Sequence, residues 1–378
     1  MAPRNPFKPT FGVTPPLLVG RDALIDEFVE ALEDGPGAAG RATLYTGARG
    51  SGKTVMLNVV EGEAKQLGWL VISETASRGL VDRISKQHLP PLLRTFDPDA
   101  VKKRLTGITG PLQVGGLTWT AVEKHAAEAG LRNQISLLTD LLREHETGLL
   151  ITLDEIHAGV IEELRELAVA IQHAFREERQ LAFAGAGLKL AIADILNDEV
   201  LTFLRRSERH EIGTVGLDDV RRALKEPIVA HGRAVTDDAL AEMAAGTHGY
   251  PFLIQLVGAQ TWRVRATARD ISLADARLGV ANALRRLGSL VHEPALAGAS
   301  DVDKTFLVAM SQDDGPSRMA DIASRLGVDA GYASVYRARL IAAELVSPAM
   351  RGYVDFTLPY LREYLREHAT ADVPTESP

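Results

Sequence analysis

The sequence predicts an α/β fold in which helices sandwich a parallel β-sheet, followed by a helical lid and a small winged-helix unit. Short apolar runs of the kind that form buried strands lie at 42–46, 69–73, 149–153 and 181–185. Amphipathic stretches such as 54–67 and 160–178 lie between these runs, and strands alternating with helices are typical of a parallel sheet covered on both faces. The strand pattern stops near residue 215, so the region 216–295 is predicted to be helical throughout.

Composition narrows the class of protein. At 378 residues the chain is longer than one hydrophobic core usually serves, so more than one domain is expected. A net charge of −8 excludes a surface coated with positive charge, although a local basic patch remains compatible with it. The absence of cysteine excludes disulfides, thiolate metal sites and cysteine nucleophiles, and fits a cytoplasmic protein. Apolar runs are too short to cross a bilayer, so we expect no membrane association.

Proline and glycine mark the boundaries of the predicted parts. Residues 1–17 are rich in proline and lack the apolar stretch of a signal peptide, so an extended arm is expected there. The segment 97–120 is rich in glycine and β-formers, which predicts a hairpin or a flexible insertion. Residues 284–300 predict a linker to a compact unit at 296–368, and the tail at 369–378 is expected to be disordered.

The strongest motif is GARGSGKT at 47–54, which matches G-x-x-x-x-G-K-[ST] between a predicted strand and a predicted helix. Glycines let backbone N–H groups approach phosphate oxygens, and the N-terminus of the following helix adds positive charge. Lys53 is expected to contact the β- and γ-phosphates, and the Thr54 hydroxyl to coordinate Mg²⁺. The alternative, a chance glycine-rich turn, does not account for the flanking strand and helix. The predicted nucleotide-binding residues of this loop are Gly47, Ala48, Arg49, Gly50, Ser51, Gly52, Lys53 and Thr54.

A second motif, LLITLDE, occupies residues 149–155. It places Asp154 at the carboxyl edge of the sheet, where open α/β sheets bind their ligands. Asp154 is predicted to hold the Mg²⁺ shell and Glu155 to polarise an attacking water as general base. A buried strand followed by a solvated acidic turn is the alternative. Together the two motifs predict ATP and Mg²⁺ as cofactors and hydrolysis of the γ-phosphate as the reaction.

With these motifs the chain resembles the AAA+ superfamily of P-loop ATPases, and is most similar to the branch of archaeal-type, origin-recognition-like and STAND ATPases. Residues 17–22 (LLVGRD) resemble the Box II segment, which implies that Val19 and Gly20 lie against the adenine. The GTHGYP sequence at 246–251 resembles the Gly-x-Pro motif of the lid, which implies a nucleotide contact by Pro251. The resemblance divides the chain into an arm (1–17), a P-loop nucleotide-binding domain (18–215), a helical lid and linker (216–295), a winged-helix-like domain (296–368) and a tail (369–378).

Two departures from this family bear on the rate of hydrolysis. The fourth predicted strand ends in FAGAG, so Gly185 and Gly187 stand where family members carry a polar sensor residue. The lid lacks an obvious arginine in the position of the second sensor. The resemblance therefore implies a slow ATPase, or a switch that reports which nucleotide is bound.

Arginines cluster just before the expected fifth strand at 210–215. The family places its arginine finger here, which implies that Arg206 and Arg209, with Arg205 beside them, reach the phosphates of a neighbouring subunit. Such a role would require a homo-oligomer. The alternative is a solvated basic turn, or salt bridges to nearby glutamates.

Two further patterns are less persuasive. The string DEIH at 154–157 also resembles a DExH helicase box, but 216–295 lacks the alternating pattern of a second helicase domain. The pair Gly185 and Gly187 lacks the third glycine of a dinucleotide fingerprint and follows the wrong strand. Neither pattern therefore changes the prediction.

The C-terminal unit predicts a helix-turn-helix at 319–346 with a two-stranded wing at 347–357. In DNA-binding versions the second helix enters the major groove and the wing contacts the backbone. The candidate DNA contacts are Ser334, Arg337, Arg339 and Arg351, with Tyr336 beside them. Winged helices also bind proteins. This unit carries only a few arginines that could contact phosphates, and it also carries several aspartates, so duplex DNA and a regulatory protein both stay open as partners.

Three functions are compatible with these predictions. The first is an ATP-binding, slow AAA+ ATPase that drives a conformational switch in association with DNA. The second is a STAND-like, nucleotide-gated switch whose winged helix binds a protein, with little or no hydrolysis. A nucleotide-binding scaffold that never hydrolyses is a third. Salt-sensitive DNA binding that differs between ATP and ADP would distinguish the first from the others.

Overall fold

The computed structural model describes residues 4–10, 12–96, 130–199 and 201–368. Internal contacts divide the chain into two compact units. The α/β unit comprises 21–47 and 52–212, and the helical unit comprises 1–20, 48–51 and 213–378. The insertion predicted within 97–120 and the predicted tail lie outside the described residues.

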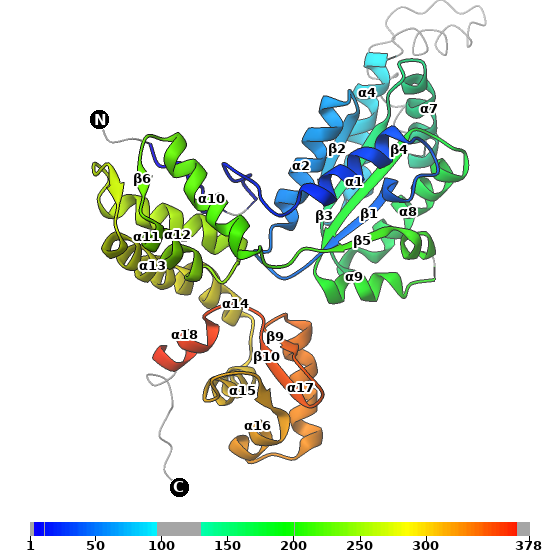
Figure 1. Ribbon diagram of the computed structural model, residues 1–378. Helices are drawn as coiled ribbons and strands as arrows, with labels where there is room; N and C mark the ends of the chain where they lie inside the picture. The colour runs from blue at the N-terminus through cyan, green and yellow to red at the C-terminus, as the bar shows by residue number, and fades with distance from the viewer. Residues whose placement is uncertain (1–3, 11, 97–129, 200, 369–378) are drawn as a thin grey trace, which may run out of the picture. The chain divides into compact units, whose positions relative to one another are not determined.

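A five-stranded parallel sheet forms the centre of the α/β unit (Figure 1), with strand order β2-β3-β4-β1-β5. This confirms the predicted α/β fold of the P-loop NTPase type. The strands are β1 (Ala42–Thr46), β2 (Leu70–Thr75), β3 (Leu149–Ile156), β4 (Leu181–Gly187) and β5 (Glu208–Glu211). The helices are α1 (Asp22–Glu33), α2 (Lys53–Gln66), α3 (Leu80–Asp82), α4 (Leu89–Phe96), α7 (Leu131–Arg143), α8 (Ile161–Arg176) and α9 (Lys189–Leu196), with shorter turns η1 (Ala39–Arg41), η2 (Arg83–His88), η3 (Ala158–Val160) and η4 (Thr202–Arg206).

Each face of the sheet has its own hydrophobic core. Successive side chains of a strand point to opposite faces, so Ile151 and Leu153 of β3 pack with α7 and α8, whereas Leu150 packs with α1 and α2. On β4 the α1 and α2 face carries the alanines Ala182 and Ala184. The core on the α1 and α2 face fixes α2 across the sheet and holds its N-terminus at the carboxyl edge.

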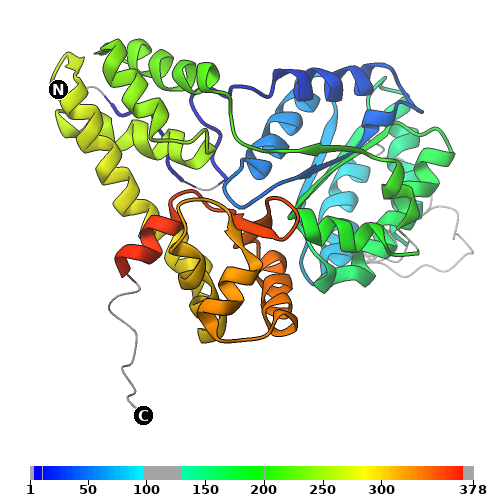
Figure 2. The same ribbon diagram turned by 60° about the horizontal axis from the view of Figure 1, so that its bottom comes forward.

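The helical unit contains four helices in the region predicted as the lid, named the lid below, and ends with a small helical and stranded segment (Figures 1 and 2). Its helices are α10 (Leu217–Ala230), α11 (Asp237–Ala245), α12 (Pro251–Val264), α13 (Leu273–Leu287), η5 (Gly288–His292), α14 (Glu293–Ala297), α15 (Asp301–Ser311), α16 (Met319–Leu326), α17 (Ala330–Ala342) and α18 (Leu361–His368). Its strands are β6 (Ala234–Val235), β7 (Asp270–Ile271), β8 (Ser317–Arg318), β9 (Val346–Pro348) and β10 (Tyr353–Phe356), and the last three form a sheet in the order β8-β10-β9. Within the described ranges, no helix is both long and apolar enough to span a bilayer.

The segment 284–300, predicted as a linker that begins within the helical region 216–295, is largely helical, since α13 is followed directly by η5 and α14. Pro294 lies in the first turn of α14. Gly288 lies against the ring of Tyr364, where an added Cβ would come within 2.9 Å of a ring carbon. The linker therefore packs against α18.

One continuous core joins the lid to the C-terminal elements. Buried side chains from α10 to α13 and from α15 to α18 belong to the same cluster. Hydrogen bonds cross the same junction: His292 Nε2 lies 2.9 Å from the carbonyl oxygen of Pro359, and the Tyr360 hydroxyl donates to the carbonyl oxygen of Gly246 at 3.0 Å. The lid and the C-terminal elements thus form a single packed body.

The N-terminal arm has no helix or strand in its described residues, yet it is docked on α12. Phe7 is 5% exposed and its ring lies so close to Gly258 that an added Cβ there would be 2.5 Å from it. Asn5 Nδ2 donates to the carbonyl oxygen of Ala259 at 3.1 Å, and the Lys8 amide donates to Gln255 Oε1 at 3.2 Å. Gly258 therefore makes room for the arm, a contact that the sequence pattern did not predict.

Candidate functional site

The glycine-rich loop leads directly into the N-terminus of α2. Gly50 and Gly52 have φ values of +72° and +100°, in the left-handed region that favours glycine. Lys53, the first residue of the helix, donates from Nζ to the carbonyl oxygen of Gly47 at 2.7 Å. Gly52, the residue before α2, makes no side-chain cap hydrogen bond, and the N-terminus of a helix favours an anion.

Ser51 adds a second indication of an anion site. Its side chain is 5% exposed, and its Oγ has no hydrogen-bond partner among the described residues. A buried hydroxyl without a partner costs about 1–3 kcal/mol, so such a group calls for an explanation. A phosphate oxygen at the N-terminus of α2 would provide the missing partner.

Thr54 and Asp154, both predicted to serve Mg²⁺, lie in direct contact. The Thr54 hydroxyl donates to Asp154 Oδ2 at 2.6 Å, although the residues are 100 positions apart. The other carboxylate oxygen, Asp154 Oδ1, accepts the backbone N–H of Glu155 at 2.8 Å. The carboxylate is therefore held in one orientation beside the hydroxyl. Hydroxyl and carboxylate oxygens are ligands that suit Mg²⁺, which commonly uses one or two protein groups together with phosphate oxygens.

Glu155 lies in a β-bulge that the sequence did not predict. Leu153 pairs with Gly185 and Ile156 with Gly187, so β3 carries one residue more than β4 over this interval. Glu155 has φ of +56° and is exposed. Bulges re-aim side chains, and left-handed conformations of non-glycine residues are costly and tend to occur at functional sites. The bulge turns the predicted general base out of the regular strand.

The glycines at the end of β4 leave no space for a larger side chain. A Cβ added at Gly185 would lie 2.6 Å from Ile156 Cδ1, and one added at Gly187 would lie 2.8 Å from the Ile156 carbonyl oxygen. Ile156 follows the bulge directly, so the bulge and the two glycines fit together. A side chain at Gly187 would have to displace the backbone of β3, and one at Gly185 would have to displace the ends of the Ile156 and Leu44 side chains.

A cavity of about 320 Å³ opens beside the Thr54 and Asp154 pair within the α/β unit. It is lined by Thr54, Leu57, Asn58, Glu61, Ser73, Glu74, Thr75, His88 and Asp154. Burial would raise the pKa of Glu74, but hydrogen bonds from Arg83 Nε and His88 Nε2, both at 2.8 Å, lower it below its ordinary value. Sequence reasoning missed this polar group; its one signal was the run Ser-Glu-Thr at the carboxyl end of the second predicted strand.

All three arginines of the cluster are exposed, and Arg205 is in addition hydrogen-bonded within the α/β unit. Arg205 Nε donates to the carbonyl oxygen of Leu196 at 2.6 Å, so this side chain is held within the α/β unit. Arg206 ends η4 and Arg209 lies in β5, and both are exposed. The fifth strand begins at Glu208, two residues before the expected position, so Arg209 lies inside it and not before it.

Val19 and Gly20, predicted to lie near the adenine, lie against the start of α10 in the helical unit. Val19 is 5% exposed, and a Cβ added at Gly20 would lie 3.1 Å from Asp219 Oδ2 and 3.6 Å from Val215 Cγ1. The Val215 amide donates to the carbonyl oxygen of Gly249 at 2.8 Å, which brings the GTHGYP turn to the same place. Val215 and Asp219 are thus additional candidate residues near the predicted adenine segment, and no sequence motif indicated them.

Pro251, the third predicted residue of this group, is the first residue of α12, where its fixed φ and missing N–H suit a helix start. Its neighbour Tyr250 donates from its hydroxyl to the carbonyl oxygen of Arg49 at 2.7 Å. Residues 48–51 belong to the same unit as Tyr250. The GTHGYP turn therefore contacts the tip of the phosphate loop directly.

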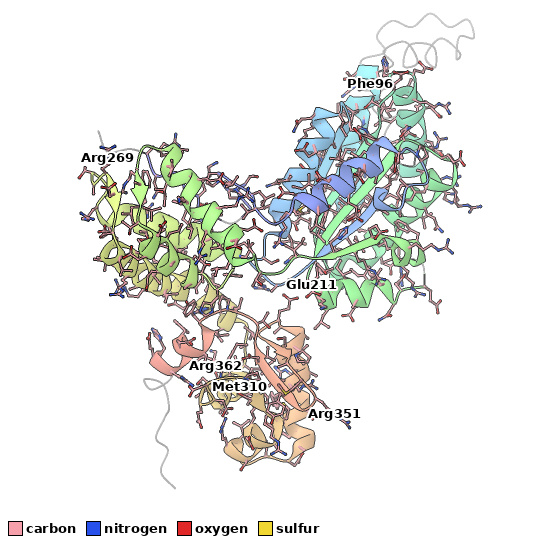
Figure 3. The ribbon with its side chains drawn as sticks, in the orientation of Figure 1. Phe96, Glu211, Arg269, Met310, Arg351 and Arg362 are labelled. Carbon is pink, nitrogen blue, oxygen red and sulfur yellow. The ribbon has the colours of Figure 1, made fainter. Side chains whose placement is uncertain are left out.

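Two of the predicted DNA contacts are exposed residues that make hydrogen bonds within the C-terminal elements. Arg339 donates to the buried carboxylate of Asp303 at 2.9 Å, and Ser334 Oγ donates to the carbonyl oxygen of Ala330 at 2.8 Å. Arg337 is half-buried. Arg351 is exposed in the turn between β9 and β10, at the outer edge of these elements (Figure 3).

Exposed apolar side chains are prominent on the same elements. Tyr332 and Val335 of α17 are 42% and 58% exposed, and Met350 in the β9–β10 turn is 60% exposed. Isolated exposed apolar residues are ordinary, and these three lie on the helix and the turn that were predicted to meet a partner.

Two family models match the chain. Residues 17–184 match the AAA ATPase domain, and residues 289–365 match a domain of unknown function, DUF8462. The first match supports an AAA-type ATPase domain in the α/β unit, in agreement with its sheet order and phosphate loop. No curated protein matches the sequence.

Solved structures share the fold at low sequence identity. The Walker-type ATPase PABY2304 of Pyrococcus abyssi is 16% identical over 92% of this chain and 96% of that chain, with a TM-score of 0.65. The RuvB Holliday junction branch migration motor of Thermotoga maritima is 18% identical over 94% and 96%, and the ORC1 protein of Aeropyrum pernix, solved in complex with DNA, is 17% identical over 94% of each chain. Both of these have TM-scores of 0.45, too low to support an argument. The first likeness shows a shared fold and nothing further.

Proposed function

We propose that this chain is a slow, Mg²⁺-dependent ATPase of the AAA+ type whose nucleotide state drives a conformational switch. The observation that carries the proposal is the 2.6 Å hydrogen bond between Thr54 Oγ1 and Asp154 Oδ2, at the N-terminus of α2. The match of residues 17–184 to the AAA ATPase domain supports the same conclusion.

Residues of the α/β unit and the loop would divide the work as follows. Lys53, the loop amides and the Ser51 hydroxyl hold phosphate oxygens, while Thr54 and Asp154 hold Mg²⁺. When bound, Mg²⁺ would supply charge that neutralises the phosphate oxygens. Glu155, turned outward by the bulge, orients and deprotonates the attacking water.

Slow turnover follows from the end of β4. Gly185 and Gly187 offer no side chain to a γ-phosphate, and Ile156 fills the space that one would need. Arg206 and Arg209 are exposed, so we propose that they act on the site of a second copy in a homo-oligomer. In that arrangement the arginines of one copy supply positive charge at the γ-phosphate bound by the other copy.

ATP binding and turnover by the wild type and the Lys53→Ala variant test the proposal. Removing the one lysine of the loop should abolish tight ATP binding. Lys189→Ala is a matched control, because Lys189 is an exposed lysine of the same unit that pairs with Glu211 at 2.7 Å. Undiminished ATP affinity in the Lys53→Ala variant, or wild type that fails to bind ATP, would overturn the proposal.

A second candidate concerns the partner. The order helix, strand, helix, helix, strand, strand from α15 to β10 supports a winged-helix domain. Exposed Tyr332, Val335 and Met350, together with Arg339 bound to Asp303, favour a protein over duplex DNA as its partner. Titration with duplex DNA at low and physiological salt, in ATP and in ADP, distinguishes them. Strong, salt-sensitive binding would restore the DNA-associated function.

A further inference from the structure

Tyr250 reaches the phosphate loop from the GTHGYP turn. Its hydroxyl donates to the carbonyl oxygen of Arg49 at 2.7 Å. The ring lies so close to the loop that a Cβ added at Gly50 would be 2.0 Å from the hydroxyl oxygen and 2.6 Å from Cζ. Gly50 is thus required by two independent features, its φ of +72° and the approach of this ring.

The tyrosine is fixed in place and remains a donor. It is 5% exposed, and burial raises the pKa of its hydroxyl, which therefore stays protonated. Its own amide donates to the carbonyl oxygen of Thr247 at 2.9 Å, and Gly249 accepts the amide of Val215 at 2.8 Å. Pro251 follows at the start of α12. A rigid turn therefore presents a permanent hydrogen-bond donor to the loop.

The hydrogen bond from Tyr250 to the Arg49 carbonyl oxygen also orients the neighbouring N–H group of the loop. In a trans peptide the C=O of Arg49 and the N–H of Gly50 point in opposite directions. A donor that holds the Arg49 carbonyl toward the tyrosine therefore holds the Gly50 N–H away from it. Phosphate loops bind their ligand through backbone N–H groups of this kind.

We propose that Tyr250 is a positioning residue of the phosphate loop, which sets the orientation of the peptide between Arg49 and Gly50 for binding the phosphates of a nucleotide. This inference rests on the proposed function. The role is specific to the phosphate chain, because Tyr250 acts on a loop amide and its hydroxyl is already committed to a carbonyl oxygen.

Calorimetric titration with ATP, ADP, inorganic tripolyphosphate and adenosine tests the inference on the full chain. Tyr250→Phe removes only the hydroxyl, and one neutral hydrogen bond contributes about 0.5–1.5 kcal/mol. We therefore expect about three- to tenfold weaker binding of ATP, ADP and tripolyphosphate, with unchanged binding of adenosine. Thermal unfolding of each variant checks that the fold is intact.

Tyr360→Phe is the matched control. The Tyr360 hydroxyl also donates to a backbone carbonyl oxygen, that of Gly246, in the same turn but away from the loop. It should lower stability slightly and leave the affinity for all four ligands unchanged. Wild type that binds neither ATP nor tripolyphosphate would overturn the proposed function itself. Wild type that binds both, with a Tyr250→Phe variant that binds them equally well or that loses adenosine to the same extent, would overturn this inference alone.

Discussion

The two units place their polar side chains in different surroundings. In the α/β unit Thr54 meets Asp154, and Glu74 accepts from Arg83 and His88, beside the cavity at the carboxyl edge of the sheet. In the helical unit the buried guanidinium of Arg233 instead donates to backbone carbonyl oxygens and holds chain segments together, as that of Arg41 does in the α/β unit. The groups that indicate a ligand are therefore those at the sheet edge or at the phosphate loop, and not buried polar groups in general.

Arg233 illustrates the structural role. Its side chain is 4% exposed and stacks over the Trp262 ring, with Cζ 4.7 Å from the ring centre. It donates to the carbonyl oxygens of Trp262 and Arg265, at 2.9 and 3.0 Å. The guanidinium thus satisfies the carbonyl groups at the end of α12 and makes no contribution to a site.

The largest effect expected from this contrast is on hydrolysis. Glu155→Gln removes the carboxylate that would activate water, and should slow ATP turnover by about 10²–10⁴-fold while ATP binding is retained. Glu178→Gln is a matched control, because Glu178 is also exposed and has φ of +50° in the same unit. Steady-state turnover and equilibrium binding measure the two quantities. Equal turnover in wild type and Glu155→Gln would remove Glu155 from the mechanism.

The next largest effect is expected on stability, from substitutions in the hydrophobic cores of the two units. Phe306 is fully buried in the core shared by the lid and the C-terminal elements, so Phe306→Ala should lower the free energy of unfolding by about 3–5 kcal/mol. Hydrogen exchange should rise in α12 as well as in α15, but not in β3. Phe183→Ala, in a core of the α/β unit, should show the reverse pattern.

Faster exchange confined to α15–α18 in the Phe306→Ala variant would mean that the C-terminal elements fold independently of the lid. Should that variant fail to fold, Phe306→Leu keeps most of the side-chain volume and gives a smaller effect of the same pattern.

Local patterns predicted much of this molecule. The sheet follows from short apolar runs, and the phosphate loop from a motif that specifies its own backbone, including left-handed glycines at 50 and 52. Thr54 and Asp154 could be paired in advance because both follow parallel strands, whose carboxyl ends share one edge.

Features that depend on packing between distant residues were not predictable. Tyr250 and Arg49 are 201 positions apart, and neither residue type indicates the contact. The bulge at Glu155 depends on the register of β3 with β4, and the contact of Gly288 with the Tyr364 ring joins elements that are far apart in the sequence. In each case a residue's role is decided by a neighbour that the local sequence does not contain.

A smaller effect should appear at low pH in the helical unit. Hydrogen bonds from Arg265, then from Ser272, hold the pKa of Asp275 well below its ordinary value, despite the opposing effect of burial. The ionised form therefore favours the folded state, and this stability is present above the ordinary aspartate pKa of about 3.9 and is lost as the pH falls through the lower folded value. Asp275→Asn should lower the free energy of unfolding at pH 7 by about 1 kcal/mol, the size of a lost helix cap.

Denaturant unfolding of wild type and Asp275→Asn at pH 7 and at successively lower pH checks this sign. The difference between them should shrink as the pH falls below 3.9. Asp270→Asn, at an exposed neighbouring position, serves as the control and should change little at any pH. A difference that grows on acidification would contradict the assignment.

The smallest effect on stability is expected at the apolar face of α17. Val335 is 58% exposed, so Val335→Lys should change the free energy of unfolding by less than about 0.5 kcal/mol. The added cation also tests the partner, because each phosphate contact steepens the salt dependence of DNA binding by about one unit of slope. With a protein partner the variant should gain no DNA binding at physiological salt, since the neighbouring Arg339 remains bound to Asp303. A large gain in salt-sensitive DNA affinity, measured by fluorescence anisotropy on duplex DNA, would mean that α17 already faces the phosphate backbone.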